Sequence, residues 1–309
     1  MRIDNIKFLK KLIPALLLIS ISLYLINSFL SKNKVISTAS KTIIEQTVKN
    51  DLNGDGKDDS LYIALKENKD YYMYATINNK DYVLKPSDKI KSIGRYSPNH
   101  PMTLNLIDID RNNIPEIIIQ SSEDKTSIQH IFKWTGENFE NIYSSTNNLL
   151  GLVDSNNGKT PKIISFSLNS SKDDIQKYML LNNNLKNISY DNLDVPGFNS
   201  ICEFINIVSL GYDLSELPNI FVSYISSEDL SQLWRLDKDN FYYVFQDAFF
   251  RDTNWNEFGE LTSCDWNVRF NKVSKIDENK TNQISFSITI EKVQDNFLIS
   301  SFEAHLNKN

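Results

Sequence analysis

The chain has 309 residues, which is enough for two domains, and it is acidic, with 33 Lys and Arg against 39 Asp and Glu. Residues 1–34 hold six of the basic residues and one Asp, which leaves 27 basic and 38 acidic residues, a net charge of −11, in the rest. This balance excludes a nucleic-acid-binding protein, whose surface would be basic.

Residues 12–30 form an uncharged stretch that is long enough to cross a bilayer as one helix. Basic residues precede this stretch at Arg2, Lys7, Lys10 and Lys11. The sequence therefore predicts a cytoplasmic tail and N-terminal transmembrane helix in residues 1–34, with the rest of the chain extracellular on a bacterial cell membrane. A cleavable signal peptide is the alternative, but its apolar region is usually shorter and ends at a run of small residues.

Residues 51–59 carry oxygen-bearing side chains at alternate positions and lead directly into the strand-like residues 60–65. These side chains are Asp51, Asn53, Asp55 and Asp59, and the backbone carbonyl of Lys57 stands at the skipped position. Calcium takes several oxygen ligands from a flexible loop, so this pattern predicts a Ca²⁺ site. An EF-hand would need a bidentate acid at the twelfth position, where this chain has Tyr62.

Two further loops repeat the pattern. The second has Asp108, Asp110, Asn112 and Glu116 at the same alternating positions, before the apolar residues 117–119. The third keeps Asp154 and Asn156 but has Gly158 and Lys162 where acids are needed. A lysine would place a positive charge beside the ion, so calcium is predicted only for the first two loops. The alternative is that all three are polar turns, because Asp, Asn and Gly are common turn residues.

The loop pattern D-x-[DN]-x-D-G-x-x-D resembles the FG-GAP/VCBS repeat of integrin-α-like β-propellers, and the phrase Phe132-Lys-Trp-x-Gly-x-x-Phe139 resembles the hairpin that closes its blades. The resemblance implies that residues 40–190 form an all-β partial propeller of about three calcium-loop blades. Propellers normally close with four or more blades, so three imply an incomplete ring.

Residues 191–197 are a predicted linker to a second domain at 197–309. Helical spacing of apolar residues predicts helices in 198–210 and 226–234 and again across 241–250. Strands are predicted at 263–271, 282–293 and 297–306. This order resembles the NTF2-like α+β fold, the cystatin-like cone, and implies an internal cavity.

Side chains for catalysis are less evident. The sequence shows no nucleophile elbow, Walker loop, dinucleotide fingerprint or zinc spacing, and His100, His130 and His305 have no evident partner in sequence. Asp265, near Trp255 and Trp266, is a candidate acid in the C-terminal cavity, although an exposed strand acid beside core aromatic residues is the plainer interpretation. Cys202 and Cys264 either form a disulfide or are two small buried side chains.

The function predicted is a non-catalytic, membrane-anchored, calcium-binding module for binding or scaffolding at the cell surface, with an envelope protein or glycan as partner. The alternative is a cell-envelope hydrolase with its site in the C-terminal cavity. Tyr71, Tyr72 and Tyr74 offer rings for stacking on a sugar, and strand alternation places Tyr71 on the opposite face from the other two.

Overall fold

The structure is a computed structural model that describes residues 41–43, 46–158, 160–171, 174–181, 184–189, 194–211 and 218–306. Residues Thr38–Asn309 form one compact unit, separate from Met1–Ser37. The stretch at residues 12–30 therefore lies outside the described residues. In the part of the chain that the structure describes, no helix is long and apolar enough to cross a membrane.

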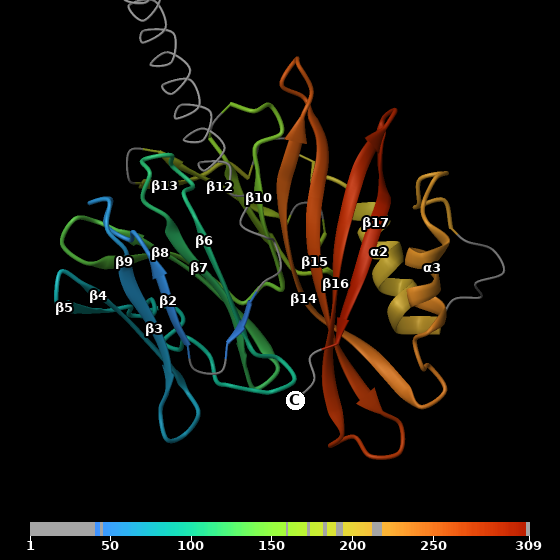
Figure 1. The fold of residues 1–309 in the computed structure, drawn as a ribbon, viewed down its shortest axis with the longest axis horizontal. Coiled ribbons are helices and arrows are strands. Elements are labelled where there is room, and N and C mark those ends of the chain that lie inside the picture. Colours follow the sequence, from blue (N-terminus) through green and yellow to red (C-terminus); the bar gives the residue numbers. More distant parts are fainter. Residues whose placement is uncertain are drawn as a thin grey trace, which may run out of the picture. The chain divides into compact units, whose positions relative to one another are not determined.

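Two antiparallel sheets follow in chain order (Figure 1), and the strands predicted after the first and second loops, at residues 60–65 and 117–119, are confirmed. The first contains β2 (Gln46–Asn50), β3 (Asp59–Leu65), β4 (Tyr71–Ile77) and β5 (Lys80–Val83). The second contains β6 (Met102–Ile107), β7 (Glu116–Glu123), β8 (Thr126–Trp134) and β9 (Phe139–Ser145), with β1 (Lys41–Ile43) added beside β6. Side chains from both sheets, among them Met73, Ile117 and Phe132, share one apolar core.

The third group of strands does not form a separate sheet. It consists of β10 (Leu149–Val153), β11 (Lys162–Phe166), β12 (Gln176–Leu181) and β13 (Asn184–Asn187). The strand β10 pairs in parallel with β14 (Phe241–Trp255), which continues into β15 (Leu261–Ser274), β16 (Thr281–Val293) and β17 (Asn296–Leu306). The result is a single eight-stranded sheet in the order β13-β12-β11-β10-β14-β15-β16-β17.

This pairing overturns the predicted fold class. The sheets do not close as a propeller, and the third group is not a blade of a partial propeller, because the inner edge of β10 is hydrogen-bonded to β14. For the same reason the C-terminal residues are not an independent NTF2-like α+β cone. The division of the chain into domains 40–190 and 197–309 stays a prediction, although the sheet itself runs across that boundary.

The helix predicted over residues 241–250 is also wrong, because these residues belong to the long strand β14. Phe249 packs into one core and Phe250 into another, on opposite faces of the same strand. A strand that is buried on both faces carries consecutive apolar residues, and such a run cannot be distinguished from a buried helix by periodicity alone. The three strands predicted after it are confirmed, within two or three residues at their ends.

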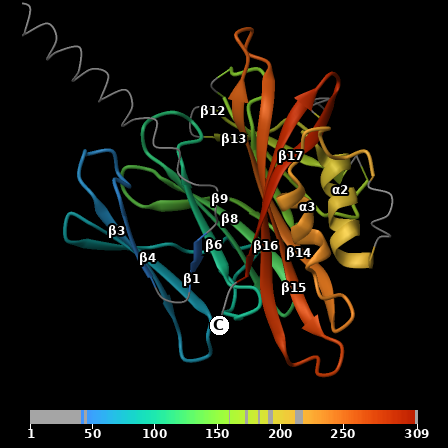
Figure 2. The same ribbon diagram turned by 45° about the vertical axis from the view of Figure 1, so that its right-hand side comes forward.

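Two short helices cover one face of β14–β17 (Figure 2). They are α2 (Phe198–Asn206), which continues into the π-helical turn η2 (Ile207–Gly211), and α3 (Ser227–Trp234). Ser226 caps α3, since its Oγ accepts a hydrogen bond from the Asp229 amide at 2.9 Å. Phe204 of α2 stacks edge-on against Phe286 and Phe302. Aromatic rings therefore fill the space where the predicted cone would have held a cavity.

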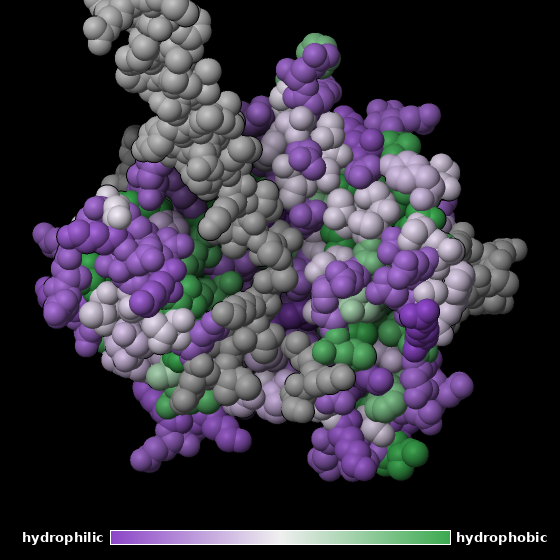
Figure 3. All heavy atoms as spheres, in the orientation of Figure 1, coloured by the Kyte–Doolittle hydropathy of each residue, from purple (hydrophilic) through white to green (hydrophobic). Residues whose placement is uncertain are grey.

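On the face shown in Figure 3, hydrophilic side chains dominate and hydrophobic ones form small separate patches. The most exposed large apolar side chains, Ile276 and Phe258, lie on turns between C-terminal strands. Scattered residues of this kind are normal for a folded protein.

Candidate functional site

The first and second loops have the same backbone geometry. In each, the amide at the second position donates to the acid at the ninth: Leu52 N to Asp59 Oδ2 at 3.0 Å, and Ile109 N to Glu116 Oε2 at 2.7 Å. The amide at the sixth position donates to the first acid in both, from Gly56 to Asp51 at 2.8 Å and from Asn113 to Asp108 at 2.9 Å. The two copies found in the sequence are therefore one structural motif used twice.

The backbone φ angles of the first and second loops also agree. The fourth and sixth positions have positive φ in both loops, at Gly54 (80°) and Gly56 (83°) and at Arg111 (59°) and Asn113 (67°). The third loop keeps a positive φ at its fourth position, Asn157 (48°). Because a side chain is strained in this region, glycine is the preferred residue, and asparagine tolerates it better than most.

The first loop carries negative charge without a positively charged partner. Among the ion pairs that the structure describes, none includes Asp51, Asp55 or Asp59. Asp59 is buried, and its pKa is raised by that burial and by the nearby Asp55 and Asp51 carboxylates, although the Leu52 amide acts in the opposite direction. The pKa of exposed Asp55 is lowered, mainly by its hydrogen bonds from Asn53 and from the Lys57 amide.

The second loop differs because a lysine enters it. Asp108, Asp110 and Glu116 each place one oxygen within 4.8 Å of the others. Lys133 Nζ from β8 donates to Asp110 Oδ2 and, at 3.2 Å, to Glu116 Oε1. In the described residues the acids of the first loop form no such close group. Acids that converge on an ammonium group can approach one another, whereas acids with nothing between them repel.

The third loop is held by charges from other parts of the chain. Arg111 of the second loop lies 3.5 Å from Asp154 Oδ2. Asp252 of β14 accepts a hydrogen bond from the Asp154 amide, and its other oxygen, Oδ1, is buried without a hydrogen-bond partner. Burial raises the pKa of Asp252 to about 7, with a further contribution from Asp154. Neither Asp252 nor its link to this loop was found from the sequence.

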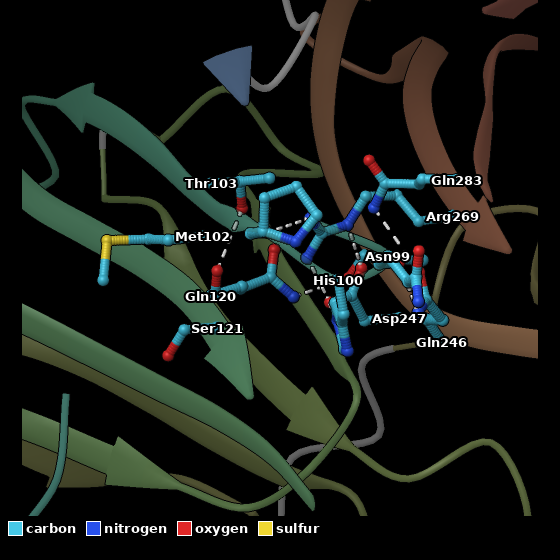
Figure 4. Close-up of polar contacts among 12 residues, drawn as sticks. Asn99, His100, Met102, Thr103, Gln120, Ser121, Gln246, Asp247, Arg269 and Gln283 are labelled. Atoms are coloured by element: carbon cyan, nitrogen blue, oxygen red, sulfur yellow. Dashed lines mark hydrogen bonds and ion pairs between the residues drawn. The ribbon is translucent and has the colours of Figure 1, made fainter. Parts of the chain in front are cut away.

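A buried ionic cluster joins the proline-rich connection at residues 85–101 to the C-terminal strands (Figure 4). His100 Nε2 lies 2.7 Å from Asp247 Oδ2, and Arg269 Nε donates to Asp247 Oδ1 at 2.5 Å. Arg269 Nη1 also donates to the Pro101 carbonyl at 2.7 Å. Burial opposes ionisation of Asp247, but Arg269 and His100 outweigh it and hold the pKa of this carboxyl well below its usual range.

Sequence reasoning placed His100 without a partner, because 147 positions separate it from Asp247. The available signal in the sequence was an arginine between two apolar residues, Val268 and Phe270, in a predicted strand. Since Arg269 binds both carboxylate oxygens of Asp247 and the three side chains are almost fully buried, this cluster fixes the connection to the sheet.

Beside this cluster lies a cleft of about 590 Å³ between the second sheet and the C-terminal strands. Its lining combines polar side chains, among them Asn99, Gln246 and Asn271, with apolar ones such as Phe245 and the ring of Tyr96. The charge of Arg95 is matched there by Asp70 at 2.9 Å and by two acids at 3.4 and 3.5 Å. Asn271 Oδ1 is buried in this lining and has no hydrogen-bond partner.

The other side chains singled out from the sequence do not come together in a site. Asp265 accepts a hydrogen bond from Thr289 at 3.0 Å and does not share a face with Trp266, which stacks on Phe250. His130 is buried and bonded to Ser144 and to the Ser92 carbonyl. Cys202 and Cys264 are free thiols.

The tyrosines divide as predicted. Tyr71 is buried in the core, whereas Tyr72 and Tyr74 lie on the outer face. The Tyr74 ring is already stacked on Tyr62, with 4.7 Å between centroids.

Comparison with known proteins does not assign this chain to a family. No family model and no curated protein matches it. Among solved structures, one match is a triple arginine-to-alanine mutant of AofleA from Arthrobotrys oligospora, with a TM-score of 0.29 and 7% sequence identity over 89% of this chain and 76% of that one. A similarity this weak supports no argument about fold or function.

Proposed function

We propose that this chain is a non-catalytic binding or scaffolding protein that acts at the bacterial cell surface and is stabilised by one calcium ion in its first loop. The observation that carries the proposal is the group of carboxylates Asp51, Asp55 and Asp59, for which the described part of the chain supplies no ion-pair partner. With the side-chain oxygen of Asn53 and the carbonyl of Lys57, they make the all-oxygen donor set that Ca²⁺ prefers.

A location outside the cytoplasm fits this donor set. Calcium sites of extracellular modules have dissociation constants of about 10⁻⁴ to 10⁻³ M, which suit the high calcium concentration there. An exposed loop with three acids and two neutral oxygens is of this weak type, because Asn53, Asp55 and the two glycines are open to solvent or only half-buried.

We assign ligand binding to the cleft beside Tyr96. Most charges in its lining are paired, with Lys125 in no described ion pair, and its other groups are carboxamides, hydroxyls, the rings of Tyr96 and Phe245, and two valines. The unsatisfied Asn271 Oδ1 calls for a donor such as a hydroxyl group. This chemistry favours an uncharged, hydroxyl-rich ligand, and we therefore propose an envelope glycan rather than a charged protein surface. The hydrolase hypothesis is not carried forward, because aromatic rings fill the helix-covered face of the C-terminal strands.

The calcium part of the proposal is tested by thermal melting of the full chain with calcium and with chelator. An ion that binds only the folded state at a concentration 100-fold above its dissociation constant stabilises it by about 2.7 kcal/mol, which corresponds to a rise in Tm of about 5 °C for a chain of this size. Asp55→Asn should remove most of this rise. Equal melting temperatures in wild type under both conditions would disprove the calcium site.

The binding part is tested by retention of envelope glycan on the immobilised chain. Asn271→Leu should reduce retention because it removes the free acceptor from the cleft. Asn296→Leu makes the same exchange at an exposed position on β17 and should leave retention unchanged. Retention that is equal in all three proteins would exclude this cleft as the binding site.

A further inference from the structure

The second loop contains its own cation. Lys133 enters from the neighbouring strand β8, and its side chain is only 5% exposed. The ammonium group donates to Asp110 and Glu116, two of the three acids that converge there. An ammonium nitrogen lies about 2.8 Å from a carboxylate oxygen and a calcium ion about 2.4 Å, so the two cations would require the same space.

The first loop has no equivalent of this lysine. In the second sheet, Ile117 pairs with Phe132, so the ninth loop position, Glu116, faces Lys133. In the first sheet, Ser60 pairs with Thr76, and the same register places Ile77 opposite Asp59. Ile77 is buried in the core between the sheets and borders the same pocket as Asn53. The two loops therefore differ at one structurally matched position, where one has an apolar side chain and the other a cation.

We infer that the second loop binds no calcium, because Lys133 is its built-in counter-ion, and that removing this ammonium group would turn the loop into a metal site. Asp108, Asp110 and Glu116 then belong to an internal ion pair that holds the loop against β8. This assignment rests on the proposed function only where it uses the first loop for comparison, and the experiments below separate the two.

The electrostatics favour the charged form of Lys133. Its burial disfavours the ammonium ion, but its hydrogen bonds to Asp110 and Glu116 and the charges of these acids outweigh this effect and raise the pKa of Lys133. Burial raises the pKa of Glu116, against the effects of the Ile109 amide and Lys133. Asp110 Oδ1 is buried without a hydrogen-bond partner, and removal of the lysine would also free Asp110 Oδ2 and Glu116 Oε1.

The first experiment leaves Lys133 in place. Calorimetric titration of the full chain with CaCl₂ should give one site in the wild type and none in Asp55→Asn. If Asp55→Asn still binds one ion and Asp108→Asn in that background removes it, the second loop takes calcium beside Lys133 and the inference is wrong. If the wild type binds no ion at all, the proposed function fails while the inference stands.

The second experiment removes the ammonium group. Lys133→Met keeps the length of the side chain, and in the Asp55→Asn background it should restore one calcium site and a Tm that rises with calcium. Lys133→Arg, the charged control, should restore neither. If Lys133→Met folds only poorly without metal, calcium should rescue it. A Lys133→Met chain that neither binds calcium nor responds to it in melting would overturn the inference.

The reciprocal exchange places a lysine in the first loop. Ile77→Lys should abolish the calcium site of the otherwise wild-type chain, whereas Ile77→Met, its uncharged match, should retain it. Undiminished calcium binding in a folded Ile77→Lys chain would show that a lysine at this position does not exclude the ion.

Discussion

Ile114 of the second loop packs against Gly54 of the first so closely that a Cβ at Gly54 would lie 2.9 Å from Ile114 Cγ1. The two equivalent loops are thus in direct contact, and the third is tied to the second through Arg111 and Asp154. Gly54 meets two requirements at once, a positive φ and a close neighbour. The three loops therefore lie next to one another in the fold.

Gly54→Ala should lower the free energy of unfolding by more than Gly56→Ala. Both glycines have φ near +80°, so alanine is strained at either position, at a cost of about 1 kcal/mol. Only Gly54 has a neighbour in the way, because a Cβ at Gly56 would meet nothing within 4 Å. Denaturant unfolding of the two variants measures the difference. Equal losses would mean that Ile114 moves aside freely.

Gly151→Ala should disrupt the junction of β10 and β14. A Cβ at Gly151 would lie 2.1 Å from ring atoms of Phe250, its partner in the parallel register. Overpacking of this kind typically costs about 1–3 kcal/mol. The measurement is a double-mutant cycle by denaturant unfolding, in which Phe250→Leu should recover part of the loss. Strictly additive losses would show that the two residues do not meet.

Asp252 should make stability depend on pH. Its pKa is about 7 in the folded chain and near 3.8 when unfolded, mainly because of burial. Between these values the folded chain holds a proton that the unfolded chain has released, so the free energy of unfolding falls as pH rises from about 4 to 7 and is level above that. At about 1.4 kcal/mol per pKa unit, the loss has an upper bound of about 4 kcal/mol.

Asp252→Asn should remove this loss. It keeps an oxygen to accept from the Asp154 amide but carries no charge, so the variant should be more stable than wild type at pH 8 and similar at pH 4. Glu257→Gln, an exposed carboxyl in the following turn, is the control and should change neither value. Denaturant midpoints at several pH values decide, and parallel profiles for wild type and Asp252→Asn would contradict the prediction.

Arg269→Met should cost about 3–5 kcal/mol, because it leaves the Asp247 carboxylate buried with His100 as its remaining ionic partner. Arg95→Met breaks ion pairs of a side chain that is 41% exposed and should cost about 0–1 kcal/mol. Thermal or denaturant unfolding of both variants tests the contrast. Similar small losses for both would mean that the cluster around Asp247 contributes little to holding the 85–101 connection.

Local sequence patterns were enough to predict several strands, the two helices and the similarity of the loops. The apolar runs after the acidic loops predicted β3 and β7, and helical spacing of apolar residues predicted α2 and α3. The spacing of Asp51 and Asp108 relative to their ninth-position acids identified two loops that share their hydrogen bonds. These features depend on residues within about ten positions of one another, so the amino-acid order by itself contains them.

Only the tertiary structure decided which strands pair and which distant side chains reach the loops. The parallel pairing of β10 with β14 buries β14 on both faces, which is why its sequence has the apolar spacing of a helix. Lys133 and Asp252 reach their loops from separate strands, and His100 meets Asp247 across 147 positions. Charge pairing depends on distance in space, and no local pattern encodes which distant side chain will neutralise a loop. The sequence alone therefore revealed three similar loops, and only the fold showed that Lys133 enters the second and that Arg111 reaches the third.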